Sequence, residues 1–305
     1  MLSVQGLRQR AALLQAVRAF FIDRGYLEVD TPIRLPVLLP ESNILPIASD
    51  GWFLQPSPEL CMKRLLAMGC TQLFQICHCF RAEEYGRLHH PEFTMLEWYH
   101  TGWDYTDLMG ECEQLIRGLC TSLASFSGLS PDGSIRRGDC EVDTARPWPR
   151  LTVAEAFRQY AGADVLEVLA SGCFDEVLVA EVEPKLGRDR PVFLHDYPAA
   201  LGSLARCRRD DPQVAERFEL YIAGVELANG FSELVDAQEQ RQRFAAEIET
   251  MRACGREASM PELFLDDLAR MDETVGIALG LDRLLMLMCG RERLTEVLPI
   301  IYEEL

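Results

Sequence analysis

The most regular alternation of apolar and polar positions lies between residues 72 and 100. The runs 72–80 (QLFQICHCF) and 92–99 (EFTMLEWY) are rich in aromatic and β-branched residues, as strands are. The segment 83–91 between them is charged and contains one Gly and one Pro. This pattern predicts an antiparallel hairpin with a long loop.

The predicted hairpin carries a high density of charge. Arg81 and Glu83 follow its first strand, and Glu97 and Tyr99 share one face of its second strand because strand side chains alternate. Burying such a set of cations and carboxylates for stability alone is costly. We therefore interpret the hairpin as a site for a polyanion together with a cationic ligand.

The rest of the chain divides into helical and strand-like runs. Apolar residues at helical spacing predict helices over 6–24, 58–69, 104–123, 153–160, 174–186 and 236–254. Strand-like runs cover 25–32, 52–55, 191–198 and, as a second hairpin with a Gly-containing turn, 217–233. Residues 128–149 are turn-rich, so we expect a single domain over residues 1–305 with a helical insertion around 128–190.

A carboxylate opens one of the predicted helices. Ser57 can cap the helix, Pro58 suits its first turn, and Glu59 follows in that turn. On spacing alone, compensation of the helix dipole explains Glu59 better than ligand binding does.

The second hairpin carries a pair of carboxylates. Glu219 and Glu226 lie on its two strands, and such a pair is what a phosphate-bound Mg²⁺ requires. The alternative is that both are exposed polar positions. Asn229, Gly230 and Glu233 extend the polar cluster along a strand that would otherwise be apolar.

The last element, GIALGLDRLLML over residues 276–287, reads as a buried strand that runs into a helix beginning near Leu281. Gly280 permits close approach of a ligand to the backbone. Arg283 in the first helical turn is unfavourable with the helix dipole unless an anion is bound, which favours a polyphosphate contact. The chain contains neither a P-loop nor a G-x-G-x-x-G motif.

Composition narrows the class of protein. The 305 residues are 48% hydrophobic and 26% charged, without a long apolar run or a signal peptide, so we expect a cytoplasmic enzyme and no membrane contact. The net charge of −18 argues against general affinity for nucleic acid. Two local basic groups, Arg206 with Arg208 and Arg209, and Lys63 with Arg64, are interpreted as solvated surface charge.

The 11 cysteines are odd in number and scattered, which indicates reduced thiols. A zinc site at Cys77, His78 and Cys79 is a weaker alternative, because a strand places His78 on the face opposite the two thiols.

Three stretches together resemble the signatures of class II aminoacyl-tRNA synthetases. GYLEVDTP (25–32) resembles the first signature, FRAEE…HHPEFTMLEWY (80–99) the second, and GIALGLDR (276–283) the third. Several stretches resemble the lysyl branch in particular, among them SPELCMKRLL, YPAALGSLAR and RFELYIAGVELANGFSEL. The resemblance covers nearly the whole chain from Leu7, and it implies an α+β fold with an antiparallel sheet flanked by helices.

Lysyl-tRNA synthetases carry an anticodon-binding OB-fold before the first signature, whereas here that signature begins near the start of the sequence. In this the chain resembles the lysyl-tRNA synthetase paralogues that attach (R)-β-lysine to a lysine of elongation factor P. The resemblance implies a protein acceptor rather than tRNA. It also implies a homodimer, because the first signature is usually an interface element.

The resemblance also implies an ATP site with magnesium. Arg81 would hold the α-phosphate and the attacking carboxylate, Arg283 the far end of the triphosphate, and Phe93 and Glu83 the adenine. Further ATP contacts are expected from Ala82, His89, His90, Glu226, Leu227 and Gly280, and magnesium ligands from Glu219 and Glu226. His90 and Ala82 stand where the family usually has Asn, which puts the contacts of those two positions in doubt.

The amino-acid pocket implied by the resemblance must hold two ammonium groups. The matching positions are Ser57, Pro58, Glu59, Glu97, Tyr99, Asn229, Glu233 and Ala278. Ala278 replaces a usual Gly, and one extra methyl changes selection among related ligands by about 1–3 kcal/mol.

Three hypotheses follow. The leading one is an ATP-dependent ligase that adenylates (R)-β-lysine or lysine and transfers it to elongation factor P. The alternatives are a truncated lysyl-tRNA synthetase-like enzyme that acts on tRNA or forms the adenylate only, and a regulatory paralogue that binds lysine without catalysis.

Overall fold

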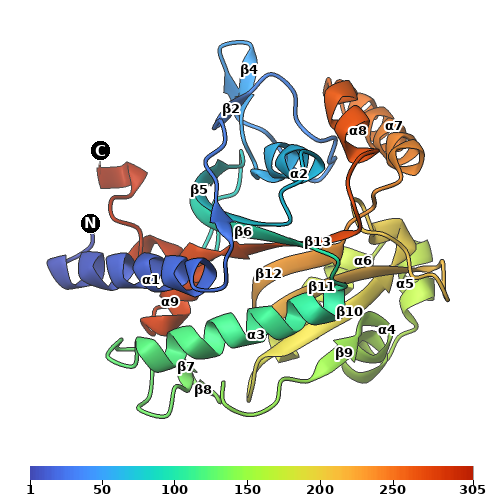
Figure 1. The fold of residues 1–305 in the computed structure, drawn as a ribbon. Helices are drawn as coiled ribbons and strands as arrows, with labels where there is room; N and C mark the ends of the chain where they lie inside the picture. Colours follow the sequence, from blue (N-terminus) through green and yellow to red (C-terminus); the bar gives the residue numbers. More distant parts are fainter. Residues whose placement is uncertain (305) are drawn as a thin grey trace.

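A large mixed sheet forms the centre of the molecule (Figure 1). The computed structural model describes residues 1–304. The strand order is β1-β5-β6-β13-β12-β11-β10-β9, and every neighbouring pair is antiparallel except β1–β5 and β9–β10. The strands are β1 Leu27–Glu28, β5 Gln72–Phe80, β6 Glu92–Thr101, β9 Arg150–Thr152, β10 Val192–Pro198, β11 Val214–Ile222, β12 Val225–Ser232 and β13 Thr274–Gly280.

Helices cover both faces of this sheet, which gives the α+β architecture predicted from the sequence (Figure 1). One face packs on α1 Val4–Ile22, α3 Tyr105–Ser122 and α9 Leu281–Met288. The other face is partly covered by α2 Glu59–Ala67, α7 Ala237–Ala253 and α8 Glu262–Leu268. No helix within residues 1–304 is long and apolar enough to cross a membrane.

Strand β6 shows how alternation divides the two faces. Leu96 and Trp98 are fully buried in the core that α1 and α3 cover, whereas Tyr99 packs in the cluster beneath α2 and α8. Glu97 therefore points to the same side as Tyr99. The predicted hairpin is confirmed, and its register pairs Gln72 with His100 and Phe80 with Glu92.

The other long predicted elements are also confirmed, including the hairpin of β11 and β12 and the strand–helix junction at Gly280. The strand predicted over 25–32 is shorter, because only Leu27–Glu28 pairs with β5. The loop expected over 33–50 contains β2 Arg34–Leu35 and β3 Ala48–Ser49, which join β4 Trp52–Leu54 in a small sheet. Strands of two residues are too short to leave an alternating pattern.

The region 128–190 is helical in its second part only. Its first part contains the small hairpin of β7 Ile135–Arg137 and β8 Cys140–Val142. The helices that follow are α4 Val153–Ala156, α5 Val165–Ser171 and α6 Phe174–Val177, with π-helical turns at Phe157–Ala161 and Leu178–Val182 and 3-10 turns at Glu183–Lys185 and, after β10, Ala199–Leu201. They bury an apolar cluster of their own against β10 and β11. Further 3-10 turns lie at Leu294–Glu296 and Tyr302–Glu304.

Candidate active site

Two neighbouring cavities open on the face of the sheet that carries Glu97 and Tyr99. The first, here the cationic cavity, is lined by Arg81, His89 and Arg283; the second, the carboxylate cavity, is lined by Glu59 and Glu97. The two cavities share four wall residues from four segments, which are Arg81, Met95, Asn229 and Ala278. A ligand spanning both would therefore pass Arg81.

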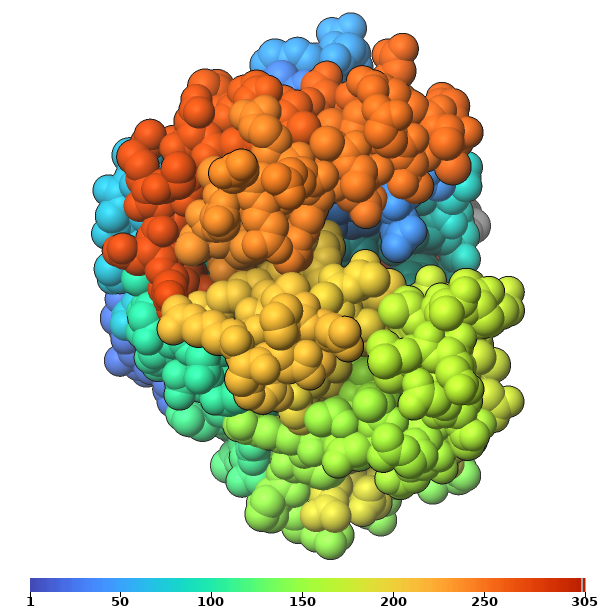
Figure 2. Space-filling view, turned by 90° about the vertical axis from the view of Figure 1, so that its right-hand side faces the viewer, coloured from blue at the N-terminus to red at the C-terminus, as the bar shows by residue number. Residues whose placement is uncertain are grey.

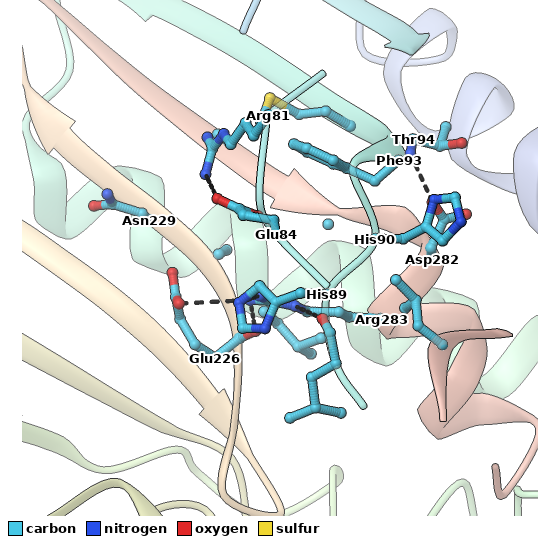
Figure 3. A pocket seen from close by; sticks show the side chains of 17 residues that line it. Arg81, Glu84, His89, His90, Phe93, Thr94, Glu226, Asn229, Asp282 and Arg283 are labelled. Atoms are coloured by element: carbon cyan, nitrogen blue, oxygen red, sulfur yellow. Dashed lines mark hydrogen bonds and ion pairs between the residues drawn. The ribbon is translucent and has the colours of Figure 1, made fainter. Parts of the chain in front are cut away.

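The cationic cavity lies between the hairpin loop and the start of α9 (Figure 3). Arg283 Nη1 donates to the carbonyl oxygen of Glu226 at 2.9 Å, and Arg283 Nη2 lies 2.8 Å from Nε2 of His89. Burial, followed by the nearby positive charge of Arg283, lowers the pKa of His89. Arg283 therefore supplies fixed positive charge beside a His89 ring that favours its neutral form, and this positive charge favours an anionic ligand.

The opposite wall of the cationic cavity carries Arg81 and Phe93. The Arg81 guanidinium lies over the Phe93 ring at 5.3 Å from its centroid, and its Nη1 is 3.6 Å from Glu84 (Figure 3). The sequence pointed to Glu83 as an adenine contact. In the structure Glu83 is exposed, has a left-handed backbone with φ of 63°, and lies outside the wall, whereas Glu84 lies in it.

The remaining residues predicted to contact ATP are distributed unevenly. Leu227 and Gly280 line the cationic cavity, but Ala82 does not, and its N–H donates to the Leu45 carbonyl at 2.7 Å. His90 is a buried wall residue whose Nδ1 lies 2.7 Å from the carbonyl oxygen of Glu92. The His90 ring is thus held by its own hairpin.

The carboxylate cavity contains a fixed, buried Glu97. One oxygen of Glu97 accepts from Tyr99 Oη at 2.5 Å, and the other accepts from Ser57 Oγ at 2.9 Å. Ser57 Oγ also accepts from the amide of Glu59 at 3.0 Å, so it links α2 to β6. Pro58 is buried at the N-cap of α2 and does not line the cavity.

The interpretation of Lys63 as solvated surface charge is wrong. Its side chain is only 2% exposed, and Nζ lies 2.5 Å from Glu59 Oε1 and 2.5 Å from Glu233 Oε2. Glu233 is itself buried behind Lys63, outside the cavity wall. The neighbouring Arg64 is 43% exposed, so the surface interpretation holds for that residue alone. The helical spacing of Glu59 and Lys63 was the signal that could have indicated this pair.

Negative charge exceeds positive charge around Lys63. Burial, with a further contribution from Glu59, raises the pKa of Glu97 to about 8. Burial also raises the pKa of Glu233 to about 8, because Lys63 offsets only part of the burial penalty and the charge of Glu59. Burial opposes protonation of Lys63, but Glu233 and Glu59 outweigh it and hold its pKa above the usual value. Glu59 and Glu233 share the one ammonium of Lys63, and Glu97 has no cationic partner within residues 1–304, which leaves room for a further cationic ligand.

Glycine at position 276 is required by close packing. A Cβ there would lie 2.3 Å from Tyr99 Cε1 and 2.5 Å from Glu233 Oε1. The small residue thus allows Tyr99 to lie against β13 while it donates to Glu97.

Glu219 and Glu226 lie on the same side of the hairpin of β11 and β12, where Tyr221 pairs with Glu226. Burial raises the pKa of Glu219, Arg217 opposes this effect, and Glu226 adds to it. Arg217, which the sequence interpretation missed, donates to Glu219 at 2.6 Å and to Asn229 Oδ1 at 3.1 Å. Residues 1–304 contain no cluster of three or more His, Cys, Asp or Glu side chains arranged to hold a metal ion by themselves.

The cysteine segment lies at the edge of this region. Cys77 and Cys79 face one side of β5 with their sulfur atoms 3.8 Å apart, and His78 is exposed on the other side, as strand alternation predicts.

Comparisons with known proteins agree with this geometry. The family described as tRNA synthetases class II (D, K and N) matches residues 3–300. A protein of Salmonella arizonae, named elongation factor P–(R)-beta-lysine ligase, is 40% identical over 309 residues, which are 97% of this chain and 94% of the relative. Proteins with the same name from Edwardsiella ictaluri and Salmonella gallinarum are 40% and 39% identical, with the same shares of each chain covered. The chain therefore belongs to the class II tRNA synthetases of the D, K and N type.

Proposed function

We propose that this protein is an ATP-dependent ligase that adenylates (R)-β-lysine or lysine and transfers it to a lysine side chain of elongation factor P. The observation that carries the proposal is the pair of cavities that meet at Arg81, one cationic and one rich in carboxylates. The relatives named for this activity support the acceptor, since the similarity extends over 94% of their length.

The cationic cavity suits ATP. Arg283 would hold the far end of the triphosphate, and Phe93 offers a face to adenine beside Arg81. Arg81 would contact both the α-phosphate and the attacking carboxylate, because it lines both cavities. Its fixed charge would stabilise the charge that develops on the phosphate oxygens. His90, which lines the cationic cavity, and Glu83, which lies outside its wall, remain proposed contacts of ATP.

The carboxylate cavity suits an amino acid with two ammonium groups. Glu59 and Glu97 line it, and Glu233 is present behind Lys63. An apolar analogue would leave Glu97 without a cationic partner, which is the basis of strong discrimination. The ligand carboxylate would then point toward Arg81, where the two cavities meet.

In the first step a carboxylate oxygen of the amino acid attacks the α-phosphorus, the bond to the β-phosphate oxygen breaks, and pyrophosphate leaves. Alignment by Arg81 and Arg283 supplies most of the acceleration. Glu219 and Glu226 would hold a magnesium ion through carboxylate oxygens, since they lie on the same side of the hairpin of β11 and β12. Bound there, Mg²⁺ would supply positive charge that offsets the charge of the pyrophosphate leaving group.

We also propose that the enzyme works in the cytoplasm as a homodimer and does not use tRNA. The test is transfer of radiolabelled (R)-β-lysine and lysine to purified elongation factor P and, separately, to total tRNA. We expect ATP-dependent label on the protein. Label on tRNA alone would contradict the proposal and favour a lysyl-tRNA synthetase-like enzyme.

A further inference from the structure

We infer that Glu41 is the general base that deprotonates the acceptor amine in the transfer step. This inference rests on the proposed function and assigns a residue to the step for which the sequence offered none.

Glu41 lies in the loop between β2 and β3 and lines the carboxylate cavity together with Glu59, Glu97 and Arg81. On the far side the same cavity extends to Asp175 of α6 and Glu247 of α7. A hollow is visible on this face between the orange helices α7 and α8 and the yellow to green segments, with part of the blue N-terminal chain in its wall (Figure 2). The cavity is therefore larger than the pocket around Glu97, and it has room for a second reactant.

Hydrogen bonds on two sides of the carboxylate cavity hold the loop that carries Glu41. The carbonyl oxygen of Leu45 accepts from the amide of Ala82, the neighbour of Arg81, at 2.7 Å. On the other side, the amide of Ser42 donates to Glu247 at 2.8 Å. Arg256 adds hydrogen bonds to the carbonyl oxygens of Ser42 and Ile44, each of 2.5 Å. Glu41 is thus fixed between Arg81, where the adenylate would lie, and the outer wall.

The Glu41 carboxylate is not engaged by the protein. Within residues 1–304 it takes part in no hydrogen bond or ion pair, in contrast to Glu97 and Glu59. The charged groups around it are Glu59 and Lys63 of α2, Arg81 after β5, and Glu247 of α7. Burial and the charge of Glu59 raise the pKa of Glu41 to about 7, which suits a base that acts near neutral pH.

The transfer step balances with one base. An acceptor ammonium gives one proton to the Glu41 carboxylate, and its freed nitrogen lone pair attacks the carbonyl carbon of the mixed anhydride. The bond from this carbon to the phosphate oxygen breaks, and AMP leaves. The second proton on the nitrogen passes to that phosphate oxygen, and Glu41 returns its proton to water.

The experiment measures the two half-reactions, formation of the adenylate and transfer to the acceptor, separately in the variant Glu41→Gln. We expect lysine-dependent exchange of pyrophosphate into ATP to stay near the wild-type rate, while single-turnover transfer from preformed adenylate to elongation factor P slows by about 100-fold at pH 7. The wild-type transfer rate should rise with pH and level off above about 7. Glu41→Gln should lack this inflection, and Glu41→Asp should retain it at a reduced rate.

Glu249→Gln is the matched control, because it makes the same change at an exposed carboxylate of α7 that lines neither cavity. We expect its transfer rate to equal that of the wild type. An equal loss of exchange and transfer in Glu41→Gln would show that Glu41 binds the amino acid and would overturn the inference. No loss in either reaction, or the same loss in Glu249→Gln, would also overturn it. Failure of the wild-type protein to label elongation factor P would instead contradict the proposed function.

Discussion

The two cavities lie on the same face of the sheet, but the charges that line them are suited to ligands of opposite charge. In the cationic cavity Arg283 and His89 lie 2.8 Å apart, and Glu226 is 3.5 Å from Arg283, so positive charge is only partly offset. In the carboxylate cavity Glu59 and Glu97 line the wall, and the single ammonium of Lys63 pairs with Glu59 and with Glu233 outside that wall. Each cavity therefore lacks the charge that its proposed ligand carries, and the shared Arg81 stands where the ligand carboxylate must meet the phosphate.

The largest expected effect comes from removing the internal cation. Lys63→Met leaves Glu59 and Glu233 buried without their partner, and breaking a buried ion pair in this way typically costs about 3–5 kcal/mol of folding free energy. Urea unfolding measures the loss. Arg64→Met is the control, because that side chain is 43% exposed and its ion pair contributes about 1 kcal/mol or less. Equal losses of folding free energy in both variants would contradict the importance of the buried ion pairs of Lys63.

Removing the shared arginine tests the junction. Arg81→Ala should slow lysine-dependent exchange of pyrophosphate into ATP by about 100- to 1,000-fold, because one fixed donor to the developing charge is lost. Arg87→Ala is matched in chemistry, but Arg87 lies outside both cavities and pairs with Glu292, so exchange should be unchanged. An undiminished exchange rate in Arg81→Ala would show that the active site has been misassigned.

A smaller change should alter selectivity. Ala278 lines both cavities opposite Glu97 on the neighbouring strand, so Ala278→Gly enlarges the place where the amino acid lies. We expect the ratio of kcat/KM for (R)-β-lysine and lysine to change by about 1–3 kcal/mol, which is roughly 5- to 150-fold. Ala228→Gly, in the cationic cavity only, should leave this ratio unchanged. A ratio that does not respond to Ala278→Gly would place selectivity elsewhere.

A further effect, which needs no substitution, is the dependence of stability on pH. The pKa values of Glu97 and Glu233 are raised in the folded protein to about 8, so the native state holds more protons than the unfolded state above the ordinary carboxyl range. Without ligand, the free energy of unfolding should therefore fall as the pH rises from about 5 to about 8. Thermal unfolding over this range measures the trend, and a rising stability would contradict it.

The same groups predict proton release on binding. A diamino acid favours ionised Glu97 and should release about one proton at pH 7. Calorimetry in buffers of different ionisation enthalpy measures this number. Glu97→Gln should reduce the release, whereas Glu249→Gln, an exposed residue of α7, should not.

The long elements of the fold were predictable because their patterns are local. The alternation in β5 and β6 correctly placed Glu97 and Tyr99 on one face, and helical spacing located α1 and α3. The antiparallel arrangement of β13 with β6 and β12 joins segments more than 40 residues apart in the sequence and was not predicted, because the family resemblance implied an antiparallel sheet without its strand order.

The parts of the site that escaped prediction depend on tertiary contacts. Lys63 looks like one half of a surface basic pair until Glu233, far along the chain, is placed beside it. Glu41 lies in a segment without periodicity, and only the contacts of its loop with Ala82 and Glu247 bring it to the cavity. Charge in a loop carries no information about which wall the loop will cover.

The place of β13 has a consequence for synthesis. This strand is the link between the sheet half built from β1, β5 and β6 and the half built from β9 to β12, and it is also the last strand of the sheet to leave the ribosome. Until residues 274–280 emerge, β6 and β12 each present an unpaired edge, and such edges promote aggregation. A nascent chain can thus acquire most of its secondary structure while still unable to bind either substrate, and a stop codon before Thr274 would produce two half-sheets rather than a weakened enzyme.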